Sequence, residues 1–199
     1  MGNRQAALFA QIVGFELRYA LRQRSIYVYC VIFALLGLFH ISVTAASAGV
    51  RLKANAPVLV AHGMAVLSLL SLFIPLAIIA GVALRDVRSK MDELIRATPV
   101  TVATYLLGRF IGAFIVTCLV FCGMLAGMMV GTKMWWIDAS VIGPLRLETY
   151  LSALAIIGLP SLFFAGALFF ATAILTRSLS ATFVSCWWSS LSISRPPSR

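Results

Sequence analysis

The sequence predicts an all-α integral membrane protein: a polytopic helical bundle with four clear spans, a partial fifth and an interfacial helix at the N-terminus. Of the 199 residues, 61% are hydrophobic and 11% are charged, and the mean hydropathy is +1.00. A soluble domain is about 45–50% apolar and about 25% charged, and a chain this small cannot bury such an apolar excess. Long uncharged runs then provide the membrane-crossing helices.

The predicted spans are apolar runs long enough to cross about 30 Å of hydrocarbon, which requires about 20 helical residues. The four spans cover residues 26–50, 58–84, 105–131 and 150–175, and the partial fifth covers 178–193. Because unpaired backbone groups are costly in lipid and the runs are apolar on all sides, helices are favoured over barrel strands.

The charge pattern predicts the domain organisation and the topology. Residues 1–25 are expected to form a cytoplasmic interfacial helix, 26–185 the transmembrane domain and 186–199 an atypical tail. The net charge is +10. Most basic residues precede the first span, lie between the second and third spans or follow the fourth: Arg4, Arg18, Arg22, Arg24, Arg85, Arg88, Lys90, Arg96, Arg109 and Arg177. The positive-inside rule therefore places the N-terminus in the cytoplasm, and the excess reflects orientation, not nucleic-acid binding.

The N-terminal segment 5–24 has the pattern of a helix that lies on the inner membrane surface. Leu8, Ile12, Phe15 and Tyr19 recur at helical spacing and predict the apolar face, while Glu16 is expected among the polar positions. An ordinary helical lead into the first span is the alternative interpretation.

The segment between the second and third spans predicts a short amphipathic helix. Opposite charges lie four residues apart, as in Arg88–Asp92 and Asp92–Arg96, beside an apolar stripe that includes Met91 and Leu94. The helix is either a solvated loop helix or a docking surface for a cytoplasmic partner. The predicted docking residues are Arg88, Met91, Asp92, Glu93, Leu94, Arg96 and Pro99.

Glycines four residues apart in the third span predict close helix packing. They are Gly108, Gly112, Gly123, Gly127 and Gly131. Small residues at this spacing let two membrane helices approach closely. Packing inside the bundle is favoured over a subunit contact, although the motif is compatible with both.

Residues for catalysis, cofactor binding or metal binding are not predicted. The chain has no G-x-x-x-x-G-K-[ST] phosphate loop and no H-E-x-x-H motif, and its two histidines, His40 and His62, lie in different predicted spans. Hydrogen bonding to a neighbouring helix is favoured over a proton relay for each histidine. The chain is therefore not expected to be an enzyme.

The stretch RDVRSKMDELIRATPVTVATYLLGRF, residues 85–110, resembles the cytoplasmic loop of exporter-type ABC transporter permeases. That family has a charged stretch, an E-L-hydrophobic-x-A-T/S-P turn and a Y-hydrophobic-L-G-R/K entry into the next helix. The matching positions are Glu93, Leu94, Ala97, Pro99, Tyr105, Leu107, Gly108 and Arg109. The resemblance extends from about Phe9 to Ser185 and includes the permease part of bacterial permease–metallopeptidase fusions, whose peptidase part this chain lacks.

The resemblance implies a permease subunit in the bacterial inner membrane. Segment 85–104 would couple to a separate cytoplasmic ABC ATPase subunit, with residues 91–98 as the coupling helix, and a second permease subunit would complete a homo- or heterodimer. Membrane lipid is the expected surrounding partner, and no cofactor is implied.

The C-terminal part departs from the family pattern, which usually has six spans. The tail after Cys186 is rich in serine and contains proline and arginine, which do not continue a lipid-facing helix cheaply. A shift of the reading frame near Cys186 is one hypothesis, under which the chain is a non-functional truncated fragment. A structural or assembly membrane protein without a transport cycle is the other alternative.

Overall fold

The described part of the chain is a bundle of helices. The computed structural model describes residues 2–47, 53–70, 76–82 and 101–176, and these ranges contain no strand. The elements are α1 (Gly2–Arg22), α2 (Arg24–Ser47), α3 (Pro57–Leu70), the π-helical turn η1 (Leu76–Ala80), α7 (Val102–Gly131), the 3₁₀ turn η2 (Ala139–Val141), α8 (Leu147–Ala153), the π-helical turn η3 (Leu154–Gly158) and α9 (Leu159–Thr176). The prediction of an all-helical architecture is confirmed for these residues.

Among the residues that the structure describes, three helices are long and apolar enough to cross a membrane, which indicates a multi-pass membrane protein. They are Arg24–Ser47, Ala103–Gly131 and Leu147–Leu175, the last of which joins α8, η3 and α9. Four clear spans are not shown, because the predicted run 58–84 is described as two pieces, the shorter apolar helix α3 and the turn η1. The partial fifth span, 178–193, lies outside the described residues.

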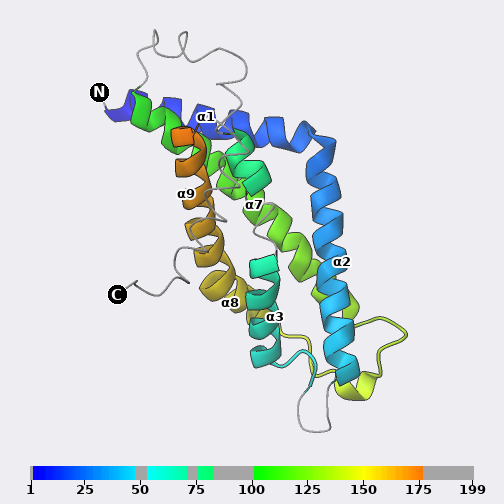
Figure 1. Ribbon diagram of the computed structural model, residues 1–199. Helices are drawn as coiled ribbons and strands as arrows, with labels where there is room; N and C mark the ends of the chain where they lie inside the picture. Colours follow the sequence, from blue (N-terminus) through cyan, green and yellow to red (C-terminus); the bar gives the residue numbers. More distant parts are fainter. Residues whose placement is uncertain (1, 48–52, 71–75, 83–100, 177–199) are drawn as a thin grey trace, which may run out of the picture.

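Helix α1 lies across the beginning of α7, and α2 leaves it at a sharp elbow and follows α7 along the bundle (Figure 1). The two long helices run in the same direction, since Cys30 packs against Gly123 and Ala34 packs against Gly127 further along both. Helix α3, the turn η1 and the α8–α9 rod lie along these helices and lead back toward the end that carries α1 (Figure 1).

The α2–α7 contact depends on backbone groups that lie close together. A Cβ on Gly127 would overlap the carbonyl of Ala34, and a Cβ on Gly37 would overlap the carbonyl of Met124. A Cβ on Gly123 would lie 3.0 Å from the carbonyl oxygen of Cys30. Each helix thus presents glycine to the other, which permits the close approach typical of small residues four apart.

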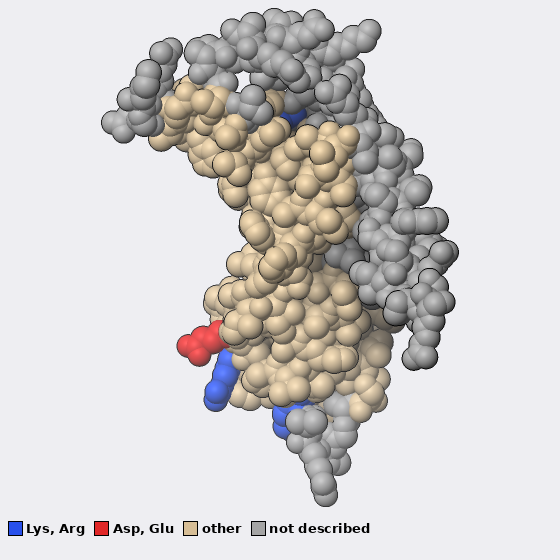
Figure 2. All heavy atoms as spheres, turned by 60° about the vertical axis from the view of Figure 1, so that its left-hand side comes forward, with Lys and Arg blue, Asp and Glu red and all other residues tan. Residues whose placement is uncertain are grey.

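Large apolar side chains fill the space between these helices. The rings of Phe33 and Phe121 pack with their centroids 5.2 Å apart, and Met64 from α3 and Tyr150 from α8 are buried in the same cluster. On the face shown in Figure 2, charged side chains of the described residues lie near the two ends, and the stretch between them carries none. Such an uncharged belt is what the hydrocarbon of a bilayer requires.

The loops at the end opposite α1 are joined by paired hydrogen bonds. The Asn55 side chain donates to the Gly143 carbonyl at 2.9 Å and accepts from the Gly143 N–H at 2.7 Å. The Ala54 N–H donates to the Val141 carbonyl at 2.9 Å. Nearby, the Ser140 N–H donates to the Asp138 carboxylate, and this hydrogen bond lowers the pKa of Asp138 below its usual value. These contacts tie the chain before α3 to the loop before α8.

Substitution of Gly127 tests the α2–α7 packing. Gly127→Ala should lower the stability of the purified protein by about 1–3 kcal/mol, because the added methyl group meets the Ala34 backbone. Gly14→Ala is the matched control, since nothing lies within 4 Å of its Cβ position and alanine favours a helix by about 0.5–1 kcal/mol. The temperature of thermal unfolding in detergent should therefore fall in Gly127→Ala and rise in Gly14→Ala. Equal shifts of that temperature in the two variants would contradict the packing.

Substitution of Asn55 tests the loop junction. Asn55→Ala removes both hydrogen bonds to Gly143 and leaves a partly buried N–H and carbonyl unsatisfied, which should cost about 1–3 kcal/mol. Limited proteolysis of the loop between α7 and α8 should accelerate in the variant. An unchanged cleavage rate would show that Asn55 does not hold this loop.

Candidate functional site

Helix α1 packs on the bundle through Ile12, which belongs to its predicted apolar face, and through Glu16 and Ala20, which do not. Ile12, Glu16 and Ala20 lie toward α7, whereas Phe15 and Tyr19 are exposed with their rings stacked at 6.2 Å. The reason is steric, because a Cβ on Gly112 of α7 would lie only 2.6 Å from the Glu16 Cβ. The glycines of α7 leave room for the Ile12–Glu16–Ala20 ridge and thereby select it over the bulky aromatic one.

The site is centred on a buried ion pair between α1 and α7. Arg109 Nη1 donates to Glu16 Oε1, with Glu16 only 2% exposed and Arg109 only 5% exposed. Arg109 Nη2 donates to the carbonyl of Val82 at 3.0 Å, and its guanidinium lies 5.6 Å from the centroid of the Tyr105 ring. Arginine suits this role, because its planar group donates in several directions and stacks on an aromatic face.

This arrangement joins three segments that are distant in the sequence. Glu16 belongs to α1, Val82 ends the described segment after η1, and Arg109 lies in the second turn of α7. Removal of one partner would leave a charge uncompensated in an apolar setting, which is far more costly than keeping the pair. The pair therefore fixes which way α1 lies on α7.

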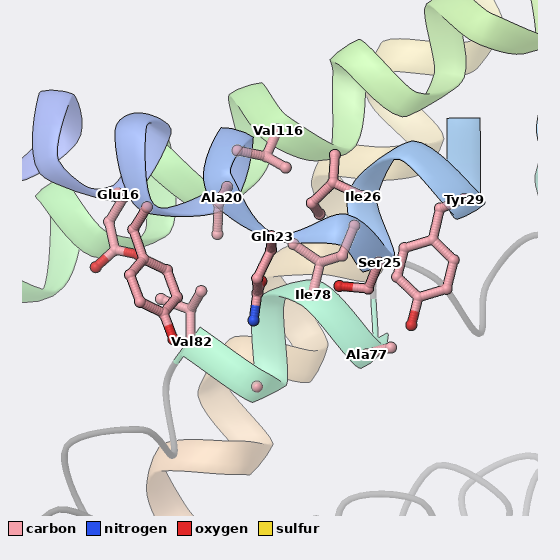
Figure 3. A pocket seen from close by; sticks show the side chains of 13 residues that line it. Glu16, Ala20, Gln23, Ser25, Ile26, Tyr29, Ala77, Ile78, Val82 and Val116 are labelled. Carbon is pink, nitrogen blue, oxygen red and sulfur yellow. The ribbon is translucent and has the colours of Figure 1, made fainter. Parts of the chain in front are cut away.

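A cavity of about 570 Å³ adjoins the ion pair at the elbow between α1 and α2. Its apolar walls come from α1, α2, α7 and the segment around η1, which includes Ile78 and Val82 (Figure 3). Gln23, Ser25 and Tyr29 supply polar groups along the elbow. The volume lies within the range of about 300–1,000 Å³ that is typical of small-molecule sites.

The predicted glycines of α7 all lie at helix contacts, but with two different helices. Gly108 and Gly112 face α1, where a Cβ on Gly108 would lie 3.0 Å from the Ile12 side chain. Gly123, Gly127 and Gly131 face α2.

The predicted docking residues, from Arg88 to Pro99, lie outside the described residues. The described chain resumes at Thr101, whose hydroxyl accepts from the Thr104 N–H at 3.3 Å and caps the start of α7.

The sequence alone does not predict the ion pair. Glu16 is expected on the polar face of a surface helix and Arg109 among the cytoplasmic charges, yet both are buried. The available signal is that Arg109 is the single charge in its apolar run and Glu16 is the single acid of segment 5–24. A lone intramembrane charge calls for a partner of opposite sign.

The histidines lie near each other across α2 and α3. A Cβ on Gly63, next to His62, would lie 2.6 Å from the Nε2 atom of His40. Within the described ranges, His40 Nδ1 is buried without a hydrogen-bond partner, and no group of three or more potential metal ligands occurs. The pair alone is too small a set for a metal site.

Comparison with known proteins gives no identification. Neither a protein-family model, nor a curated protein sequence, nor a solved structure matches the chain.

A double-mutant cycle tests the ion pair. Arg109→Met alone leaves the Glu16 carboxylate buried and unpaired, and Glu16→Leu alone does the same to Arg109, so each should cost about 3–5 kcal/mol. The double variant removes both charges and should be more stable than either single variant. Thermal unfolding in detergent gives the comparison, and additive losses would show that the two side chains do not interact.

Proposed function

We propose that the chain is the membrane-spanning permease subunit of an ATP-driven exporter of the ABC type. It would act in a bacterial inner membrane with its N-terminus in the cytoplasm. A separate ATPase subunit would bind segment 85–104, and a second permease subunit would complete the pathway. The support is the resemblance of residues 85–110 together with the geometry at both ends of that segment.

One observation carries the proposal. Arg109 is the last residue of the Tyr105–Arg109 stretch that resembles the family's entry motif, and it bonds Glu16 of α1 and the carbonyl of Val82. Val82 precedes the proposed coupling segment and Arg109 follows it. A force applied to that segment by a partner would reach α7 through the backbone, and the Arg109 side chain would pass it on to α1.

The packing suggests how such a force would spread. Helix α2 packs against α7 through backbone contacts at Gly37 and Gly127, so we expect these two helices to move as one unit. The α8–α9 rod meets α7 through aromatic side chains, such as the edge-on pair Phe114–Phe163 at 5.8 Å. Side-chain contacts of this kind permit small sliding between helices more readily than backbone contacts do. ATP binding on the partner would rock the α1–α2–α7 unit against the returning helices.

Substitutions in the coupling segment test the proposal. Leu94→Asp should weaken binding to the ATPase about tenfold or more, because loss of an apolar anchor in an interface typically costs about 2 kcal/mol. Glu93→Lys should weaken it by reversing a charge. The measurement is co-purification with a co-expressed Walker-motif ATPase encoded beside this chain.

Glu148→Lys is the matched control, because it makes the same charge reversal on an exposed residue at the opposite end of the bundle. It should leave the ATPase yield unchanged. Undiminished ATPase recovery with Leu94→Asp and Glu93→Lys, at equal yields of monodisperse protein, would refute the proposed coupling.

A further inference from the structure

We propose that the cavity at the α1–α2 elbow binds one anionic phospholipid, with an acyl chain between the apolar walls and the glycerol–ester region along Gln23, Ser25 and Tyr29. This inference does not rest on the transport function. It rests on the shape, lining and charge of the elbow.

The elbow is held in shape by its own hydrogen bonds. The Gln23 N–H donates to the Ala20 carbonyl at 2.9 Å, and the Ile26 N–H donates to the Gln23 carbonyl at 3.2 Å. The Tyr27 hydroxyl donates back to the Leu21 carbonyl at 2.8 Å. The turn between the two helices is therefore built before any ligand enters, which lowers the cost of binding.

The lining separates apolar and polar groups as an ester lipid requires. Ala20, Ile26 and Val116 lie on one side, and Ala77, Ile78 and Val82 lie on the other (Figure 3). Between them, Gln23 projects toward η1, and the hydroxyl groups of Ser25 and Tyr29 lie at one end of the row (Figure 3). Amide and hydroxyl donors match the carbonyl oxygens of acyl esters, and the walls match the hydrocarbon chain.

The charge at the elbow favours an anionic headgroup. Arg22 and Arg24 flank Gln23 and are exposed, and Arg18 is exposed one turn earlier. Glu16 is the single acid in residues 2–25, and its charge is compensated by Arg109. Exposed arginines where an interfacial helix meets a span attract anionic lipid phosphates.

Gly81 permits a cavity-filling substitution. It lines the cavity, and a Cβ placed on it would meet no atom within 4 Å. We therefore expect the side chain in Gly81→Leu to enter the space proposed for the acyl chain. Gly14→Leu is the matched control, because Gly14 also has open space around it but does not line the cavity.

The experiment is photo-cross-linking in phosphatidylcholine nanodiscs that contain a small fraction of phosphatidylglycerol with a diazirine on its acyl chain. Cross-links should map to the elbow and η1 in the unchanged protein and in Gly14→Leu. In Gly81→Leu their yield should fall about tenfold, because the leucine displaces buried methylenes of the chain. Excess unlabelled phosphatidylglycerol should abolish them in the unchanged protein.

Three results would overturn the proposal. One is an equal cross-link yield at the elbow in Gly81→Leu. Another is failure of unlabelled phosphatidylglycerol to compete in the unchanged protein, a comparison that needs no variant to fold. The third is equal labelling by a phosphatidylcholine probe, which would remove the assigned preference for anionic lipid.

Discussion

The buried contact between Glu16 and Arg109 constrains the rest of the structure. It acts together with the glycines of α7, which leave room for the narrow Ile12–Ala20 face of α1 while the bulky Phe15–Tyr19 face lies outward. Because each charge is costly without the other in an apolar setting, the pair admits one position of α1 and disfavours alternatives. The elbow and its cavity follow, since Glu16 and Ala20 form part of the cavity wall.

The glycines of α7 supply the second constraint. Ile12 and Glu16 meet Gly108 and Gly112, and after the break at Gln23 the partners of Gly123 and Gly127 are Cys30 and Ala34. The offset in residue number between each α7 glycine and its partner therefore differs by three residues before and after the elbow, which is nearly one helical turn. Helix α7 thus packs against both α1 and α2 through glycines, and the sharp turn between α1 and α2 lies where this offset changes.

Much of the architecture can be predicted from local sequence properties, whereas the site depends on long-range pairing. Apolar runs predict membrane helices because backbone groups in a bilayer must form their hydrogen bonds within the segment. The spacing of Gly123 and Gly127 predicts close helix packing. The contact between Glu16 and Arg109 cannot be predicted in this way, because an amphipathic pattern assigns each charged residue to the solvent-facing side of its helix. The face of α1 also depends on glycines far away in the sequence, which no window of α1 contains.

The ion pair and the elbow cavity share Glu16, and this has an energetic consequence. A ligand that fills the cavity packs against the carboxylate side of the pair and against Val82, whose carbonyl accepts from Arg109. Such a ligand stabilises the arrangement in which α1, η1 and α7 are held together, to the extent that it binds this arrangement better than one with α1 displaced. By reciprocity, a partner that binds one of these two arrangements better than the other changes the affinity of the cavity for its ligand by the same factor as the ligand changes the affinity for that partner. On the proposed assignment, lipid binding at the elbow is therefore coupled to the displacement of α1 from α7.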